Sequence, residues 1–198
     1  MKWIEYNIRK GEKNFTPSEP WLPGLAKGFE FWVAFHHSCY FSWADREFDG
    51  DWKDVMKLRM LTLAYTPNNH LSYGAGFMPA NGFGYILTTP YTNYPGTDFQ
   101  TRREDSVKVK TVGTLPEAQL EAGSMAYGRV TRNSRKVFYH FECGNEELNV
   151  SHDFRLKWWQ PWISRLTGTW AGGANNSPGR YGGEASQDMK LWLNFNTI

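Results

Sequence analysis

The stretch VMKLRMLTLAY, residues 55–65, decides the fold. Alternate side chains of an extended strand share a face, so Lys57 and Arg59 are predicted to lie on one face and Leu58 and Met60 on the other. This alternation is typical of a β-strand whose one face is half exposed. Two cations at neighbouring positions on one face repel each other. The stretch therefore also predicts a bound carboxylate or a cross-strand acid between them.

Similar short segments recur along the chain, each bounded by Gly, Pro, Asn or Asp. They are GFEFWVAFH, HLSYGAGFM, FGYILTT, SVKVKTV, SMAYGRVTR, KVFYHFE, HDFRLKW and DMKLWLNF. Many short strands at near-regular spacing predict an all-β fold, an antiparallel two-sheet β-sandwich of the jelly-roll type. The one helical candidate, LPEAQLEA at residues 115–122, is too short to build a layer, so we expect a helical turn in a connecting loop.

Length and charge limit the classes of protein that fit this chain. The 198 residues suit a single domain, residues 1–198, with a sizeable core. The net charge of +2 predicts neither nucleic acid nor an anionic membrane as a partner. The first residues, MKWIEYNIRKGEKN, lack the apolar region of a secretory signal, and no apolar run approaches the roughly 20 residues of a membrane span. We therefore expect a protein that is cytoplasmic as synthesised.

The chain has two cysteines, Cys39 and Cys143. Two thiols are too few for a disulfide scaffold or for a thiolate zinc site of the usual four-ligand kind. We expect two buried free thiols, with a single disulfide bridge as the alternative. His37 shares a face with Cys39, but the spacing of these residues gives no support to a cysteine nucleophile.

An acidic turn, DREFDGDW at residues 45–52, lies between the first two predicted strands. Its acids are Asp45, Glu47, Asp49 and Asp51. With Gly50 in the sixth place it imitates the start of an EF-hand calcium loop, but Met56 stands in the twelfth place, where a bidentate glutamate belongs. A solvated turn is the simpler interpretation, and no cofactor is then expected. The alternative is a calcium ion held by these carboxylates and by backbone carbonyls.

Aromatic residues make up 17% of the chain, with ten tryptophans, which is more than a core of this size requires. Sugars present C–H faces that stack on aromatic rings and hydroxyls that bond to amides and guanidinium groups, so a glycan-binding surface is expected. The candidate ligand-binding residues are Arg59, Trp158, Trp159, Trp162, Asn175, Asn176, Arg180 and Tyr181. A corner of the core beside a glycine-rich loop, or a protein contact, would use the same residues.

Several segments resemble small concanavalin A-like jelly-roll proteins of Bacteroidetes and their phages. They are FEFWVAFHHSCYF, DVMKLRMLTL, LKWWQPW, AGGANNSP and QDMKLWLNF, which lie toward both ends of the chain. The middle, residues 88–121, shows no such similarity. The resemblance implies a concanavalin A-like jelly roll, and a phage origin would imply association with the virion after lysis.

The same layout is more distantly similar to the jelly-roll alginate and glucuronan lyases. This similarity implies catalytic roles for a lysine, a histidine and tyrosines on the concave sheet, which here are Lys57, His70, Tyr73 and Tyr85. The match fails at two positions. Gly74 stands where the lyases have an arginine, and Leu87 stands where they have a second tyrosine, so the clamp for the substrate carboxylate is missing.

Three functions remain open at this point. The hypothesis favoured by the aromatic residues is a non-catalytic protein that binds a polysaccharide or other glycan. The second is a polysaccharide lyase that cleaves uronate-containing glycans by β-elimination. The third is a structural virion or assembly module, whose partners would be virion proteins or copies of itself.

Overall fold

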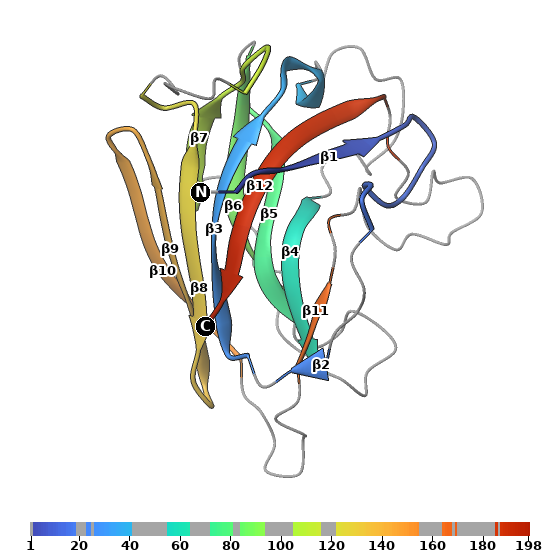
Figure 1. The fold of residues 1–198 in the computed structure, drawn as a ribbon. Coiled ribbons are helices and arrows are strands. Elements are labelled where there is room, and N and C mark those ends of the chain that lie inside the picture. The colour runs from blue at the N-terminus through green and yellow to red at the C-terminus, as the bar shows by residue number, and fades with distance from the viewer. Residues whose placement is uncertain are drawn as a thin grey trace, which may run out of the picture.

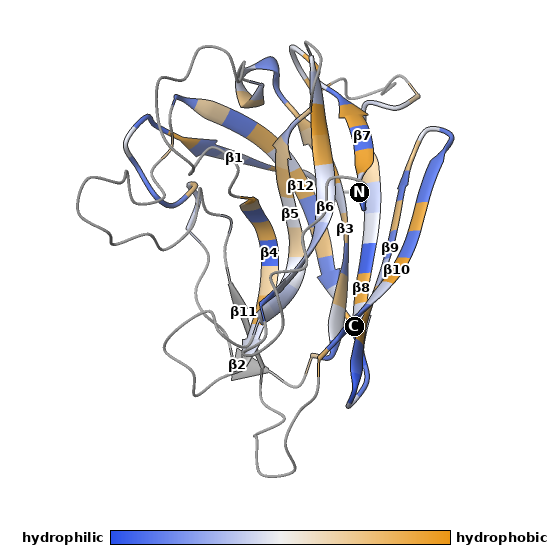
Figure 2. Cartoon of the chain, turned by 180° about the vertical axis from the view of Figure 1, so that it is seen from behind, coloured by the Kyte–Doolittle hydropathy of each residue, from blue (hydrophilic) through white to orange (hydrophobic). Residues whose placement is uncertain are grey.

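The computed structural model of the protein (Figure 1) describes residues 2–18, 23–24, 26–40, 55–63, 72–80, 84–93, 105–115, 122–154, 164–167, 169, 185 and 187–198. Their strands form two six-stranded sheets in which the paired strands run antiparallel. One sheet lies in front of the other in Figure 1 and behind it in the reversed view of Figure 2. The predicted all-β, two-sheet sandwich is thus confirmed.

Sheet A has the strand order β1-β12-β3-β8-β9-β10. The bounds are β1 Ile4–Ile8, β12 Met189–Thr197, β3 Gly28–Phe35, β8 Ala126–Arg132, β9 Lys136–Cys143 and β10 Glu146–Asp153. A short 3-10 helix, η1 (His37–Cys39), directly follows β3. The first and last strands of the chain are therefore neighbours in one sheet.

Sheet B has the strand order β2-β11-β4-β5-β6-β7. The bounds are β2 Pro23–Gly24, β11 Ser164–Thr167, β4 Met56–Leu63, β5 Ser72–Pro79, β6 Tyr85–Asn93 and β7 Val107–Lys110. No helix among the described residues is long and apolar enough to cross a membrane. Most of the segment predicted to form a helical turn, residues 116–121, lies outside the described residues.

The core lies between the two sheets, where alternate residues of the strands point inward. Phe29, Phe31 and Phe35 of β3 are fully buried. The Phe35 ring packs against Phe77 of sheet B, with ring centroids 5.1 Å apart, and Phe31 packs against Phe141 at 5.8 Å. Figure 2 shows the same alternation as apolar and polar bands along the strands. The outer face of sheet A is therefore left largely for polar residues, whereas Val55, Met60, Met78 and Tyr91 form a second buried apolar cluster in sheet B.

Strand β4 departs from simple alternation at a β-bulge. Lys57 pairs with Gly76, but Arg59 pairs with the adjacent Ala75, so Leu58 is an extra residue. Leu58 belongs to the core between the sheets. Arg59 also points into this space, whereas Lys57 points to the outer face of sheet B. The prediction that Lys57 and Arg59 share a face is wrong, because the bulge inserts one residue between them.

Arg59 is also not a surface residue. Its side chain is fully buried, and its guanidinium carbon lies 3.8 Å from the centroid of the Phe195 ring of sheet A. Nη2 donates a hydrogen bond of 2.8 Å to the hydroxyl of Tyr6. The predicted ligand-binding role of Arg59 is therefore corrected to a structural one, a cation stacked between the sheets.

Both cysteines are free and buried, as expected. Cys39 Sγ donates to the carbonyl oxygen of Lys190 at 2.9 Å, and this bond fixes η1 against the start of β12. Burial raises the pKa of Cys39 to about 12. Burial, followed by the nearby charge of Glu146, raises the pKa of Cys143 to about 11. Both thiols therefore stay protonated near neutral pH.

Candidate functional site

Most of the residues singled out from the sequence lie outside the described residues, so their roles stay predictions. They are His70, Trp158, Trp159, Trp162, Asn175, Asn176, Arg180 and Tyr181, with the acidic-turn residues Asp45, Glu47, Asp49 and Asp51. Among the described residues, no group of three or more His, Cys, Asp or Glu side chains could hold a metal ion.

Lys57 and Tyr85 lie on the outer face of sheet B, but not together. Lys57 is only 2% exposed, and its Nζ lies 4.8 Å from the centroid of the Tyr91 ring. Through Gly76 it aligns with Thr89 of β6, four residues from Tyr85, which corresponds to about 13 Å along the strand. Tyr91 is thus the tyrosine beside Lys57.

Tyr73, the other described residue of the expected lyase set, lies on the opposite face of sheet B. It is 1% exposed, its hydroxyl accepts a bond of 3.0 Å from Arg132 Nε, and it donates to the Lys27 carbonyl at 3.2 Å. Burial raises its pKa to about 12. The predicted catalytic role of Tyr73 beside Lys57 is wrong, because the two side chains point to opposite faces of sheet B.

The outer face of sheet A carries polar and aromatic side chains in cross-strand rows. One row is Trp32, Tyr127, Glu142 and Glu147; the next is Glu30, Arg129, His140 and Asn149; a third is Thr131, Phe138 and Ser151. The rings of Trp32 and Tyr127 lie 5.0 Å apart, and the Tyr127 hydroxyl donates to Glu30 at 3.3 Å. This face is therefore an ordered surface of rings, carboxylates and amides.

A hollow of about 320 Å³ lies on this face, and we call it the Phe138 hollow. Its lining side chains include Arg129, Thr131, Phe138, His140, Asn149 and Ser151. The Phe138 ring is 42% exposed, although rings of this size are usually buried. Within the described residues, the Arg129 guanidinium makes no hydrogen bond or ion pair. The hollow thus combines an apolar ring, a cation, hydroxyls and an amide.

His140 is held at the rim of the Phe138 hollow by acceptors on both ring nitrogens. Nδ1 bonds to Asn149 Oδ1 at 2.8 Å, and Nε2 bonds to Glu142. The Asn149 amide is oriented by its own Nδ2, which donates to Glu147 at 2.7 Å. Both partners of the ring only accept, so the complete set of bonds requires the doubly protonated imidazolium.

The electrostatic surroundings of His140 agree with this protonation state. Burial lowers its pKa, but the bonds to Asn149 and Glu142 and the charges of Glu142 and Glu147 outweigh that effect. The net result is a pKa raised above the ordinary value. Glu147 Oε1 lies 3.7 Å from Nδ1, and the Tyr127 ring packs edge-on at 6.0 Å. The hollow therefore gains a positive charge as the pH falls.

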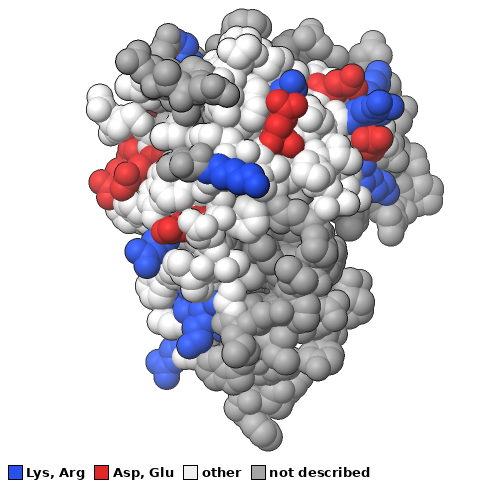
Figure 3. Space-filling model, in the orientation of Figure 1, with Lys and Arg blue, Asp and Glu red and all other residues white. Residues whose placement is uncertain are grey.

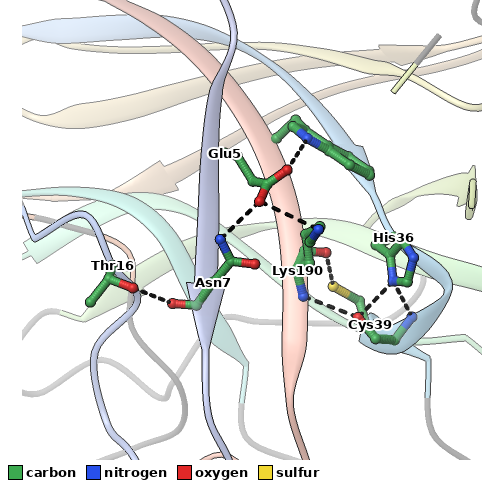
Figure 4. Close-up of polar contacts among 8 residues, drawn as sticks. Glu5, Asn7, Thr16, His36, Cys39 and Lys190 are labelled. Atoms are coloured by element: carbon green, nitrogen blue, oxygen red, sulfur yellow. Dashed lines mark hydrogen bonds and ion pairs between the residues drawn. The ribbon is translucent and has the colours of Figure 1, made fainter. Parts of the chain in front are cut away.

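A second hollow, of about 530 Å³, lies on sheet A beside β1, η1 and the start of β12, and we call it the β1–β12 hollow. Its lining includes Asn7, Arg9, Glu12, Thr16, Asp188 and Lys190. Figure 4 shows the polar contacts around it. Figure 3 shows acidic and basic side chains interspersed on the described part of this side of the molecule, with no field of a single sign.

Glu5 orders the side chains next to the β1–β12 hollow (Figure 4). Its Oε1 accepts from Asn7 Nδ2 at 3.1 Å and pairs with Lys190 Nζ at 3.4 Å, and its Oε2 accepts from Trp192 Nε1 at 3.1 Å. The bond from Asn7 contributes most to a lowered pKa of Glu5, which partial burial opposes. The carboxylate therefore stays ionised and keeps Asn7 and Lys190 in fixed positions.

Both hollows were missed in the sequence. A signal was present, because every second residue of β8, β9 and β10 is polar or aromatic, as in Tyr127 and Arg129 or Glu147 and Asn149. The pattern marks an outer face but does not separate a binding surface from an ordinary solvated one. The exposure of Phe138 makes that distinction, and exposure comes only from the structure.

Comparison with solved structures identifies the class of fold. The alginate lyase Aly36B, a mutant in complex with alginate trisaccharide, has a TM-score of 0.51 at 10% identity, over 99% of this chain and 82% of that one. The PL-14 alginate lyase from Aplysia kurodai has a TM-score of 0.48 at 10% identity, over 99% and 83%. Basic winged bean lectin with Tn-antigen has a TM-score of 0.36 at 10% identity, over 99% of both chains.

Only the first of these scores exceeds 0.5, and at this identity it shows the fold alone. Together with the strand order, it makes the protein a jelly-roll β-sandwich, a fold that this alginate lyase shares. No family model matches the sequence, and no curated protein matches it significantly.

Proposed function

We propose that the protein binds polysaccharide and that the Phe138 hollow is a binding site. The observation that carries this proposal is the 42% exposed Phe138 ring, which lies beside a guanidinium, two hydroxyls and an amide. A sugar ring can stack its C–H face on the phenyl ring while its hydroxyls bond to these polar groups. The jelly-roll alginate lyase in complex with a trisaccharide supports the proposal, because its fold carries a saccharide.

Binding without cleavage is the form of the proposal that the described residues support. Lys57 is buried against Tyr91, Tyr85 lies about 13 Å along β6, and Tyr73 faces the other side of the sheet. The described members of the expected lyase set therefore do not converge on one point. Lyase activity would need a general base and a proton donor within reach of one sugar unit.

The proposal extends to the origin that the sequence resemblance suggests. In a phage or Bacteroidetes genome, lysis would bring a protein made in the cytoplasm into contact with extracellular polysaccharide. Finding phage structural genes beside the coding sequence would support this part. Finding the gene far from any prophage would contradict this part and leave the binding proposal intact.

A glycan array followed by calorimetry on the retained sugars tests the binding proposal. We expect Phe138→Ala to weaken binding at least tenfold, about 1.4 kcal/mol, because the stacking surface is removed. Ile198→Ala is the matched control, since Ile198 is the other exposed large apolar residue described, at 44% exposure, and lies outside the hollow. The control should bind as the wild type does.

Two outcomes count against the proposal. One is an array without any retained glycan. The other is a Phe138→Ala variant that binds as well as the wild type. If the wild type instead elutes as an oligomer that Phe138→Ala dissociates, the exposed ring is a protein contact, and the assembly module replaces the glycan-binding protein.

A further inference from the structure

We propose that the β1–β12 hollow is a second saccharide site, so that one polysaccharide chain is held at two places on the same face of sheet A. This inference rests on the proposed function and adds a site to it. It is carried by the lining of the hollow, whose hydrogen-bonding groups are fixed in place and in part unused, and by the position of the hollow relative to Phe138.

The acceptors of the β1–β12 hollow are held by the backbone. Glu12 Oε2 accepts from the Arg9 backbone nitrogen at 3.1 Å, and Asp188 Oδ1 accepts from the Lys10 nitrogen at 2.8 Å. Within the described residues, the second oxygen of each carboxylate has no bond. Both carboxylates can therefore accept from ligand hydroxyls without rearranging, which lowers the ordering cost of binding.

The donors of the hollow are equally available. The Arg9 guanidinium makes no hydrogen bond or ion pair with described residues. Lys190 Nζ, held by Glu5 at 3.4 Å, keeps further protons for a ligand. Asn7 donates its amide protons toward Glu5, so its Oδ1 remains on the other side of the group (Figure 4). The hollow is thus lined by both donors and acceptors.

This balance of charge identifies the class of ligand. The hollow is lined by two cations, Arg9 and Lys190, and by two acids, Glu12 and Asp188. His36 adds no charge, because burial, followed by the nearby Lys190, lowers its pKa and its Nδ1 accepts from the Ser38 nitrogen at 3.0 Å. A ligand of one strong charge would face repulsion here. A polyhydroxyl ligand uses donors and acceptors equally, and about 530 Å³ is room for a small ligand of this kind.

The strand register sets the distance between the two hollows. Lys190 lies beside His36 at the end of β3, whereas Phe138 aligns through Thr131 with Gly28 at its start. Eight residues along the strand and three strand spacings across the sheet amount to roughly 30 Å. A short oligosaccharide can occupy only one hollow, while a polymer can occupy both, with a gain in affinity from effective concentration.

Calorimetry and affinity electrophoresis test this inference with three named neutral probes: mixed-linkage β-glucan, xylan and galactomannan, each as trisaccharide and as polymer. The double variant Arg9→Ala/Glu12→Gln removes the guanidinium and one carboxylate, and Lys13→Ala is its exposed neighbour outside the hollow. For a retained probe, we expect two trisaccharides per wild-type protein and one per double variant or Phe138→Ala variant. Polymer affinity should fall at least tenfold in either variant.

The possible failures separate the two proposals. The second site is overturned if the wild-type protein binds one trisaccharide, and if this binding is lost in Phe138→Ala but kept in Arg9→Ala/Glu12→Gln. The proposed function then still stands. Two sites without any gain for the polymer overturn the shared-chain arrangement. Should none of the probes or array glycans be retained, the proposed function fails and this inference fails with it.

Discussion

His140 joins the Phe138 hollow to the acidic row next to it, and its protonation state decides the shape of the hollow rim. A neutral imidazole has one N–H and cannot donate to both Asn149 and Glu142. On deprotonation, one contact is lost or the Asn149 amide turns over, which breaks its bond to Glu147. The charged groups that face the ring are Glu142 on β9, Glu147 on β10 and Arg129 on β8.

The first prediction concerns the titration of this side chain. Because its pKa is raised in the folded protein, the stabilisation from His140 is complete below the unfolded pKa of about 6.5 and is lost as the pH rises through the folded pKa. Nitrogen-detected NMR should give a midpoint above that of an unfolded histidine, and Glu142→Gln should lower it. Polysaccharide affinity should fall across the same pH range.

Asp153→Asn serves as the control for this titration, because Asp153 lies on the same face of β10 but four residues from Asn149. It should leave the midpoint unchanged. A wild-type midpoint at or below 6.5 would show that the imidazolium network is not formed.

At the scale of elements, the pairing of β4 with β5 depends on glycine. A Cβ placed on Gly74 would overlap the Arg59 carbonyl oxygen and would lie 2.7 Å from Met60 Sδ and 2.8 Å from Met60 Cα. Gly76 is filled in the same way by Val55 and by the Met56 carbonyl oxygen at 2.7 Å. An arginine side chain therefore has no room at position 74.

The second prediction follows from this close approach. Gly74→Ala should lower the free energy of unfolding by about 2–3 kcal/mol or more, because backbone atoms of β4 must move to admit the methyl group. Gly113→Ala is the control: its Cβ would meet His37 Nε2 at 3.5 Å, an ordinary contact. Urea denaturation of both variants checks this, and equal stabilities would show that β4 and β5 pair less closely than described.

The same two strands show how far sequence alone could go. The short segments between turn residues predicted β3, β4 and β5, and with them the sandwich. Alternation of side chains marks a strand with one buried face, but every residue of β5 is buried. The alternation failed at the bulge beside Leu58, which no glycine or proline marks. The sequence also predicts the end of β6 at Thr89, because proline usually terminates a strand. The strand instead continues to Asn93. Pro90 is tolerated because β7 pairs with β6 only as far as Thr88, so position 90 lies beyond that ladder.

The candidate site could be predicted less well than the fold. Strand spacing pointed to Arg59 and the resemblance to the lyases pointed to Tyr73, but both are polar groups buried between the sheets. In the segment KVFYHFE, the sequence does not distinguish the exposed Phe138 from its buried neighbours Tyr139 and Phe141. The distinction requires knowing which alternate residues of β9 face outward. That choice depends on pairing with distant strands, which a single sequence does not give.

For the molecule as a whole, the two thiols report on the closure of the sandwich. Cys39 and Cys143 are buried, with pKa values raised to about 12 and about 11, so the reactive thiolate is scarce at pH 8. We expect neither thiol to react readily with Ellman's reagent in the native protein and both to react in guanidinium chloride. In guanidinium chloride, the Cys143→Ser variant should show one reactive thiol per chain. Rapid reaction of either thiol under native conditions would contradict this packing.

The position of β12 bears on how the molecule is made. This strand, near the end of the chain, lies between β1 and β3, whose residues leave the ribosome far earlier. Until β12 emerges, β1 has no strand beside it in sheet A, and β3 keeps one unsatisfied edge. Closure must therefore await translation of residues 189–197, and a nascent chain would need to keep its phenylalanine-rich β3 from pairing with other chains in the meantime.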